Sequence, residues 1–292
     1  MLEEEIISER IADIKQILGI LKSEICAIDE KGRSKKQTKK DSIDELTRAS
    51  ILFTQRSYLD FYRKIVNFIY SKLEENVSDK DFFFYIPLLR TLIEIYAYLL
   101  YFCFQNEKRQ MELLISKTLY TLAKADSSLK TKEIQEQYNL YYESFKPFMD
   151  REKLVFPKNT DEFSGKWLGN SGYDNPPVDQ MLKTEWIKES SPQISSFAKY
   201  PENNPYIMYK HFSNYIHGNV LSKDDYGNEK FWIISEVINL SGQMVELVSI
   251  KILDNSRKKE ISEWIKRVSK NTPEFIKLWN SKKEKIARER SN

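Results

Sequence analysis

Hydrophobic residues recur every three to four positions along most of the chain, which is the period of an α-helix with one buried face. The alternating pattern of a half-buried strand never persists long enough to build a sheet. The spacing predicts helices over these ranges: 3–28, 42–75, 82–104, 107–125, 130–146, 178–189, 204–218 and 228–254, with two amphipathic helices after them. We therefore expect an all-α fold.

Local signals set several of these boundaries. Ser42 followed by Glu45 is a capping box, which predicts the start of the second helix. Pro205 suits the first turn of the 204–218 helix, and Gly218 suits its end. The second helix is carried by these periodic apolar residues: Leu46, Phe53, Phe61, Ile65, Phe68 and Ile69.

The chain changes character between residues 147 and 205. Seven of the nine prolines and three of the eight glycines lie there, and the only periodic piece is the 178–189 helix. A long irregular insertion in a helical protein is typically a lid or a binding loop. Trp167, Tyr173 and Trp186 make disorder a poor explanation. We expect the insertion, near 147–204, to cover the functional site, with Trp167 or Tyr173 as a wall.

We expect a helical-bundle domain over residues 1–255 and a basic helical extension over 256–292. Residues 251–292 contain 13 Lys or Arg and 6 Asp or Glu, whereas the whole chain has a net charge of only +3. Each terminal helix also has an apolar stripe, so its lysines are explained by a solvated face. The alternative is contact with nucleic acid, which is strongly electrostatic. The candidate residues are Arg257, Lys258, Lys259, Lys266, Arg267 and Lys270.

Composition excludes several classes of protein. With 41% hydrophobic and 30% charged residues, the chain has the composition of a folded domain. Cys26 and Cys103 form no CxxC motif, and no GxGxxG, GxxxxGK[ST] or HExxH motif occurs. His211 and His217 lie about 120° apart around their helix and cannot bind one metal ion as a pair. We expect neither a metal nor a cofactor.

The 82–104 segment is long enough to cross a membrane, but other features oppose this role. Arg90 and Glu94 lie near its middle, at a cost that cancels the gain from its apolar residues, and Pro87 weakens it further. The first residues are acidic, unlike a secretory signal. We expect a buried core helix in a cytoplasmic protein that does not bind membranes.

Charged groups in this apolar segment mark the candidate site. Arg90 and Glu94 are four residues apart, so they share one face of the helix. Buried charges without partners are costly, so this face must meet polar groups from elsewhere in the fold. The 204–218 helix is the best supplier, because these residues fall in one sector of it: Tyr206, Tyr209, Lys210, Ser213 and His217.

The combination of Arg90-x3-Glu94 in an apolar helix with Tyr209-x3-Ser213-x3-His217-Gly218 resembles bacterial helical proteins related to the HEPN superfamily. The similarity covers roughly residues 45–255. It implies a helical bundle, often dimeric, and many HEPN proteins are metal-independent ribonucleases or toxins of defence systems. The usual motif places Arg four to six residues before His on one helix. No Arg precedes His211 or His217 at that spacing, so the arginine would come from Arg90.

These residues suit RNA cleavage if they meet across the two helices. His217 can take or give a proton near neutral pH, and Arg90 with Lys210 can stabilise charge that develops on phosphate. Ser213 would orient His217. Two alternatives stay open: a buried polar network in which Arg90, Glu94 and His217 satisfy one another, and a small-ligand site.

We therefore expect a defence or toxin-type protein with a ribonuclease centre at Arg90, Glu94 and His217. Its expected partners are RNA, a protein of a defence system and further copies of itself. The alternative is a non-catalytic interaction or sensor module in a defence complex.

Overall fold

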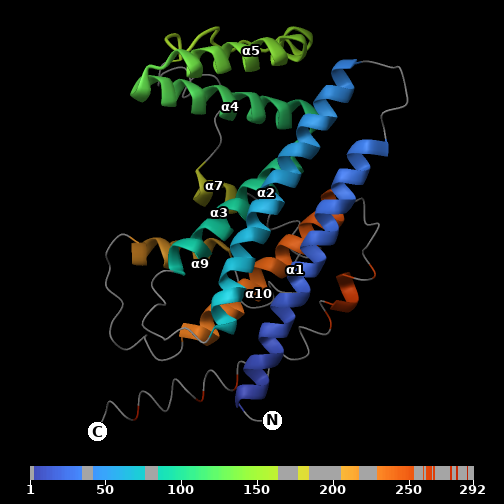
Figure 1. Ribbon diagram of the computed structural model, residues 1–292, viewed down its shortest axis with the longest axis vertical. Helices are drawn as coiled ribbons and strands as arrows, with labels where there is room; N and C mark the ends of the chain where they lie inside the picture. The colour runs from blue at the N-terminus through green and yellow to red at the C-terminus, as the bar shows by residue number, and fades with distance from the viewer. Residues whose placement is uncertain are drawn as a thin grey trace. The chain divides into compact units, whose positions relative to one another are not determined.

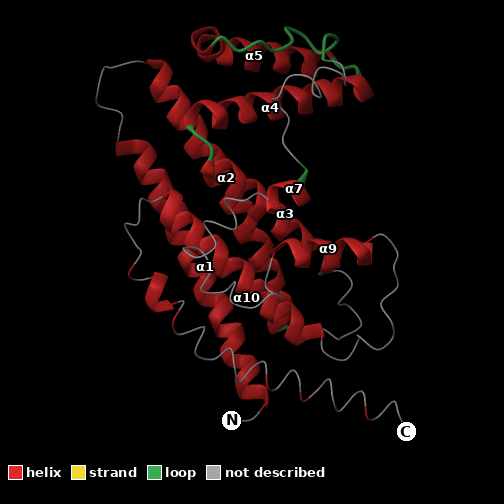
Figure 2. Cartoon of the chain, turned by 180° about the vertical axis from the view of Figure 1, so that it is seen from behind, coloured by secondary structure: helices red, strands yellow, loops and turns green. Residues whose placement is uncertain are grey.

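The computed structural model describes these residues: 3–34, 42–75, 85–163, 177–183, 205–216, 229–252, 259, 261–264, 266, 277, 281 and 288. Within them it contains helices joined by loops and no strand (Figure 2). The all-α prediction is confirmed. The helices are α1 (Glu3–Ser34), α2 (Ser42–Glu74), α3 (Ile86–Phe104), α4 (Glu107–Leu129), α5 (Lys132–Glu152), α7 (Val178–Lys183), α9 (Pro205–Ile216) and α10 (Glu229–Leu247), with a π-helical turn over Val248–Ile252.

The chain divides into two compact units. Unit 1 comprises residues 1–28, 57–100 and 178–292, and unit 2 comprises residues 29–56 and 101–177. The division falls within α1, α2 and α3. The expected split into a 1–255 domain and a 256–292 extension stays a prediction, since few residues beyond 252 are described.

The core of unit 1 is built from α1, α2, α3, α9 and α10, shown in Figure 1. From Leu89 to Leu100, α3 has buried residues around most of its circumference, apart from the side that carries Arg90 and Glu94, which is the pattern of a central helix. Tyr58 of α2 and Tyr98 of α3 have ring centroids 4.6 Å apart. These residues of α3 and its neighbours are fully buried: Leu59, Ile69, Leu89, Leu92, Ile93, Leu99, Phe212, Ile234 and Leu240.

By its length and composition alone, α3 could cross a membrane. It is the one helix in the described ranges that is long and apolar enough to do so. Of its most apolar stretch, 61% is buried inside the protein. This burial agrees with the expected core helix.

Unit 2 contains the hairpin of α4 and α5, which pack against each other (Figure 1). Only Lys130 and Thr131 separate the two helices. Lys130 adopts a left-handed conformation with φ 47° and its N–H donates to the carbonyl of Asp126, closing α4. Thr131 Oγ1 accepts from the N–H of Ile134 at 3.4 Å and caps α5. A tight αα-hairpin follows from these two caps.

One predicted boundary is wrong. Irregular structure was expected to begin at Pro147, but α5 continues through Pro147 to Glu152. Proline removes a single backbone hydrogen bond from the helix. The last turn is held by burial of Phe148 and Met149 and by the Lys146–Asp150 ion pair at 2.8 Å. Tertiary packing overrides the local preference.

Residues 153–163 leave α5 and return along the hairpin. Tyr138 Oη donates to the carbonyl of Pro157 at 2.8 Å, and Thr160 Oγ1 donates to Asp126 Oδ2 at 2.6 Å. The rings of Tyr120 and Phe163 are 5.8 Å apart. These contacts fasten the segment to the hairpin of unit 2.

Other boundaries move by a few residues. α1 reaches Ser34 and α4 reaches Leu129, both beyond the predicted ends. α9 begins at Pro205, as expected, and its predicted end at Gly218 lies outside the described residues. The predicted helix over 228–254 is α10 followed by the π-helical turn.

Candidate functional site

Arg90 and Glu94 form an ion pair on α3. Arg90 Nε donates to Glu94 Oε1 at 3.0 Å, as the four-residue spacing predicts. The side chains are 23% and 37% exposed, so the pair is less buried than the sequence suggested. A partly exposed pair of this kind contributes below about 1 kcal/mol to folding stability. Its value lies more in the orientation it gives the guanidinium.

Tyr209 of α9 is the second partner of Arg90. Arg90 Nη2 donates to the Tyr209 hydroxyl at 3.4 Å, and the guanidinium carbon lies 5.4 Å from the centre of the tyrosine ring. The expected meeting of the third helix with the 204–218 helix is thus present. Burial lowers the pKa of Arg90, but the Tyr209 hydroxyl and Glu94 together raise it by more than burial lowers it. The pKa of Arg90 is therefore raised above its ordinary value.

The guanidinium of Arg90 is held in place and, among the described residues, has donors without an acceptor. Two of its five N–H groups reach Glu94 and Tyr209. No side chain in the described part of the chain accepts a hydrogen bond from Nη1. An oriented and partly exposed guanidinium is suited to bind a phosphate or carboxylate.

Lys210 and Ser213, on the same helix as Tyr209, are placed differently. Lys210 is exposed, and its Nζ lies 5.8 Å from the centre of the Tyr206 ring. Ser213 Oγ is buried, and no hydrogen bond to it exists among the described residues. Neither residue forms a hydrogen bond or an ion pair with Arg90 or Glu94 in the described ranges.

Much of the expected site lies outside the described residues, including His217, Trp167, Tyr173 and Trp186. Of the basic residues expected to bind nucleic acid, Lys259 and Lys266 are described, and both are exposed. Arg257, Lys258, Arg267 and Lys270 also lie outside. A described piece of the expected insertion, α7, packs against α9, the helix that carries Tyr209. The role of the insertion as a lid stays a prediction.

A polar seam inside α10 was missed by the sequence analysis. Glu236, Asn239, Gln243 and Glu246 are all buried, although α10 is otherwise an apolar core helix. Their spacing of three, four and three residues places them on one face. Burial raises the pKa of Tyr96, and the charge of Glu246 raises it further. The regular spacing of these polar residues in an otherwise apolar segment was the sequence signal that could have identified the seam.

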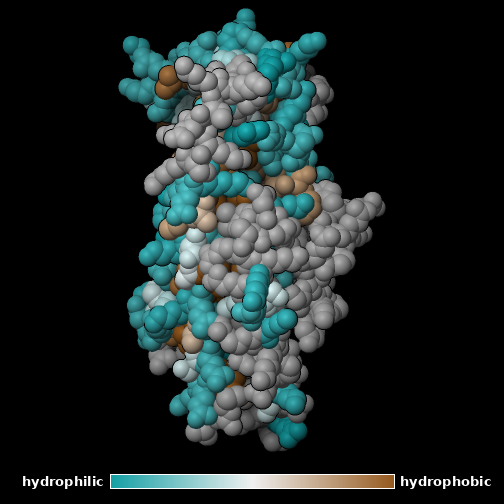
Figure 3. Space-filling view, turned by 90° about the vertical axis from the view of Figure 1, so that its right-hand side faces the viewer, coloured by the Kyte–Doolittle hydropathy of each residue, from teal (hydrophilic) through white to brown (hydrophobic). Residues whose placement is uncertain are grey.

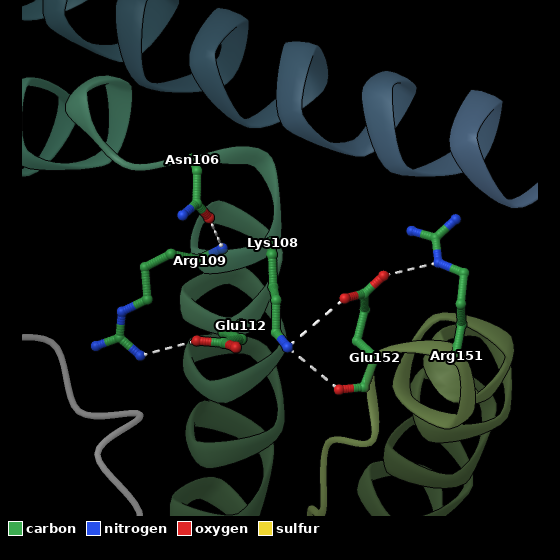
Figure 4. A network of polar contacts seen from close by, with 6 residues as sticks. All are labelled: Asn106, Lys108, Arg109, Glu112, Arg151 and Glu152. Atoms are coloured by element: carbon green, nitrogen blue, oxygen red, sulfur yellow. Dashed lines mark hydrogen bonds and ion pairs between the residues drawn. The ribbon is translucent and has the colours of Figure 1, made fainter.

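A second polar network, in unit 2, joins the start of α4 to the end of α5 (Figure 4). Lys108 Nζ donates to the carbonyl of Glu152 at 3.3 Å and lies 3.6 Å from its carboxylate. Arg109 pairs with Glu112 at 3.1 Å. Each charge has a neighbour of opposite sign, which is typical of a structural network.

In the described part of the chain, no three His, Cys, Asp or Glu side chains are grouped so as to hold a metal ion. On the face shown in Figure 3 the described side chains are mostly hydrophilic, with scattered hydrophobic ones. The Arg90 cluster is thus the most developed candidate for binding an anion.

Comparison with family models, curated proteins and solved structures finds no match to this chain. The relationship to the HEPN superfamily stays a prediction.

Proposed function

We propose that the protein is a HEPN-like, metal-independent endoribonuclease of a bacterial defence or toxin system, acting in the cytoplasm. The observation that supports this proposal is the guanidinium of Arg90, which Glu94 and Tyr209 orient while the other described residues take none of its remaining donors. Phosphate oxygens match those donors in charge and geometry. Tyr209 belongs to the same motif as Ser213 and His217, four and eight residues further along the chain.

In the proposed reaction the 2′-hydroxyl oxygen of a ribose attacks the adjacent phosphorus. His217 takes the hydroxyl proton as general base. The bond from phosphorus to the 5′ oxygen breaks, and that oxygen takes a proton from a water molecule, which regains one from the protonated His217. The products are a 2′,3′-cyclic phosphate and a 5′-hydroxyl, and His217 is neutral again. Arg90 stabilises the negative charge on the phosphorane-like transition state, and Lys210 adds positive charge nearby.

The test is cleavage of labelled RNA by the whole chain in the presence of EDTA. Wild-type protein should release products ending in 2′,3′-cyclic phosphate, and DNA of the same sequence should stay intact because it lacks the 2′-hydroxyl. His217→Ala and Arg90→Ala should each lower the rate by about 10²-fold or more. His211→Ala is the matched control, because it removes the other histidine of the same predicted helix. Full activity of His217→Ala would refute the proposed base.

One observation favours a second function. Glu94 and Tyr209 already give Arg90 a counter-ion and an acceptor, as in a purely structural network. In that case the protein is a non-catalytic interaction or sensor module of a defence complex. Wild-type protein would then cleave no RNA with or without Mg²⁺. Arg90→Ala would lower the melting temperature and leave the affinity for RNA unchanged.

A further inference from the structure

α2 has two apolar faces, and among the residues that the structure describes one of them is buried and the other is exposed. Ile65 and Ile69 belong to the core, being 7% and 0% exposed. The other face contains four large hydrophobic side chains, which we call the α2 stripe: Leu46, Phe53, Phe61 and Phe68, with exposures of 50%, 68%, 52% and 49%.

The stripe belongs to a single helix, α2, which runs from Ser42 to Glu74 and is drawn as one continuous ribbon in Figure 1. At about 100° per residue its four members fall within a sector of about 80°. They extend over 22 residues, or about 33 Å of helix. Four large exposed side chains aligned over this length are more than scattered surface hydrophobics, and such alignment marks an interaction surface.

The spacing of the stripe is symmetric about Ser57. Phe53 and Phe61 lie four residues before and after Ser57, and Leu46 and Phe68 lie eleven residues before and after it. If a second α2 runs antiparallel with the two-fold axis at Ser57, Phe53 meets Phe61 of the second copy, and Leu46 meets its Phe68. This is the self-complementarity that an isologous interface requires.

Polar residues on the same face agree with this register. Ser57, half-buried, would lie on the axis, where a small side chain lets two helices approach closely. Lys64, 66% exposed, is the charged residue inside the sector. It lies seven residues after Ser57, so in the antiparallel pair it faces Ser50 of the second copy, which lies seven residues before Ser57. A parallel pairing would instead bring two Lys64 ammonium groups together. Charge therefore favours the antiparallel pair.

We propose that the α2 stripe is a homodimer interface in which two copies pair antiparallel about Ser57. The exposed parts of the four side chains amount to about 400 Å² per copy, or about 800 Å² for the pair. The smaller residues between them bring the total toward the lower limit of about 1,200 Å² for specific interfaces. A dimer of micromolar affinity is expected, with exchange between monomer and dimer.

The first test is sedimentation or light scattering of the full chain between about 1 and 100 µM. Wild type should change from monomer to dimer over this range. Phe53→Glu and Phe61→Glu should each weaken association at least tenfold, since each substitution enters the interface twice. Leu140→Glu is the matched control: Leu140 is 70% exposed but lies on α5, so association should not change. A monomer at every concentration, or equal loss in the control, would overturn the proposal.

The second test fixes the register. In a Cys26→Ser, Cys103→Ser background, Ser57→Cys should form a disulfide-linked dimer under mild oxidation. Ser71→Cys should not, because the two copies of residue 71 would be about 42 Å apart along the helix axis. Cross-linking through both positions would indicate parallel helices, and cross-linking through neither would exclude the paired α2 helices. The outcome is independent of RNA cleavage.

Discussion

The hydroxyl oxygens of Tyr62 and Ser241 lie 3.2 Å apart, although 179 residues separate them in the sequence. Tyr62 is on α2 and Ser241 is on α10, and both side chains are completely buried in unit 1. A buried hydroxyl without a partner is costly, so each residue depends on the other. The pair joins an early helix of the chain to one that begins 155 residues after α2 ends.

Tyr62→Phe should lower the free energy of unfolding by about 1–2 kcal/mol, because it leaves the Ser241 hydroxyl unsatisfied and changes little else. Ser241→Ala should have an effect of similar size, measured by urea denaturation. In the double variant the loss of unfolding free energy should be smaller than the sum of the two single losses, since the interaction can be lost only once. Full additivity would show that the hydroxyls do not interact.

Stability should fall steeply above pH 10. Burial raises the pKa of Tyr58 to about 12, and burial also raises the pKa values of Tyr62 and Tyr96 above the ordinary value of 10. Above pH 10 the unfolded chain has lost protons that the folded chain retains, so stability decreases as pH rises. The loss continues until the folded-state pKa is reached.

The measurement is urea denaturation at pH 9, 10, 11 and 12. Tyr62→Phe should reduce the slope of stability against pH by up to about 1.4 kcal/mol per pH unit. Val66→Ala is the control: it weakens the same buried core without removing a titratable group, so it should lower stability and leave the slope unchanged. An unchanged slope in Tyr62→Phe would contradict the raised pKa of Tyr62.

Sequence periodicity predicts the helices well, since it is a local property. It does not show which of two apolar faces meets the core. The periodic residues of the second helix include Phe53 and Phe61 together with Ile65 and Ile69, yet only the isoleucines are buried. The distinction requires the neighbouring helices, which spacing alone does not place.

The site was predictable to a similar extent. The Arg90–Glu94 pair follows from a spacing of four residues, and the polar sector of the 204–218 helix indicates the facing element. Which residue of that sector contacts Arg90 is a tertiary result, and it is Tyr209. Continuation of α5 through Pro147 was missed for the same reason, because it depends on burial of Phe148 and Met149.

Lys130→Gly should stabilise unit 2. Lys130 adopts φ 47° at the end of α4, a conformation that costs a side-chain-bearing residue about 1–2 kcal/mol. Glycine adopts it freely but loses more entropy on folding, which leaves a net gain of about 0.5–1 kcal/mol. The measurement is thermal or urea unfolding. Lys132→Gly, two residues later and inside α5, should have the opposite sign, and stabilisation by both would contradict the conformational explanation.

Arg90→Lys separates the charge of Arg90 from its geometry. Lysine can pair with Glu94 but has no fork with which to reach Tyr209 as well. Because the pair is partly exposed, stability should change by less than about 1 kcal/mol. RNA cleavage should fall about 10²-fold, since oriented donors to the transition state are lost.

Glu94→Gln should act more mildly, because it leaves Arg90 in place and removes only the charge that orients it. We expect the cleavage rate to fall about tenfold while affinity for an uncleavable 2′-deoxy analogue stays within twofold. Glu94 is in this sense a positioning residue, and the split between rate and affinity is a readout that a purely structural role would not produce. Lys132→Gln, an exposed charge change in unit 2, is the control and should affect neither rate nor affinity. If Arg90→Lys retains full activity, the phosphate is stabilised by another group. If both Arg90→Lys and Glu94→Gln lose several kcal/mol of stability, the cluster is a structural network.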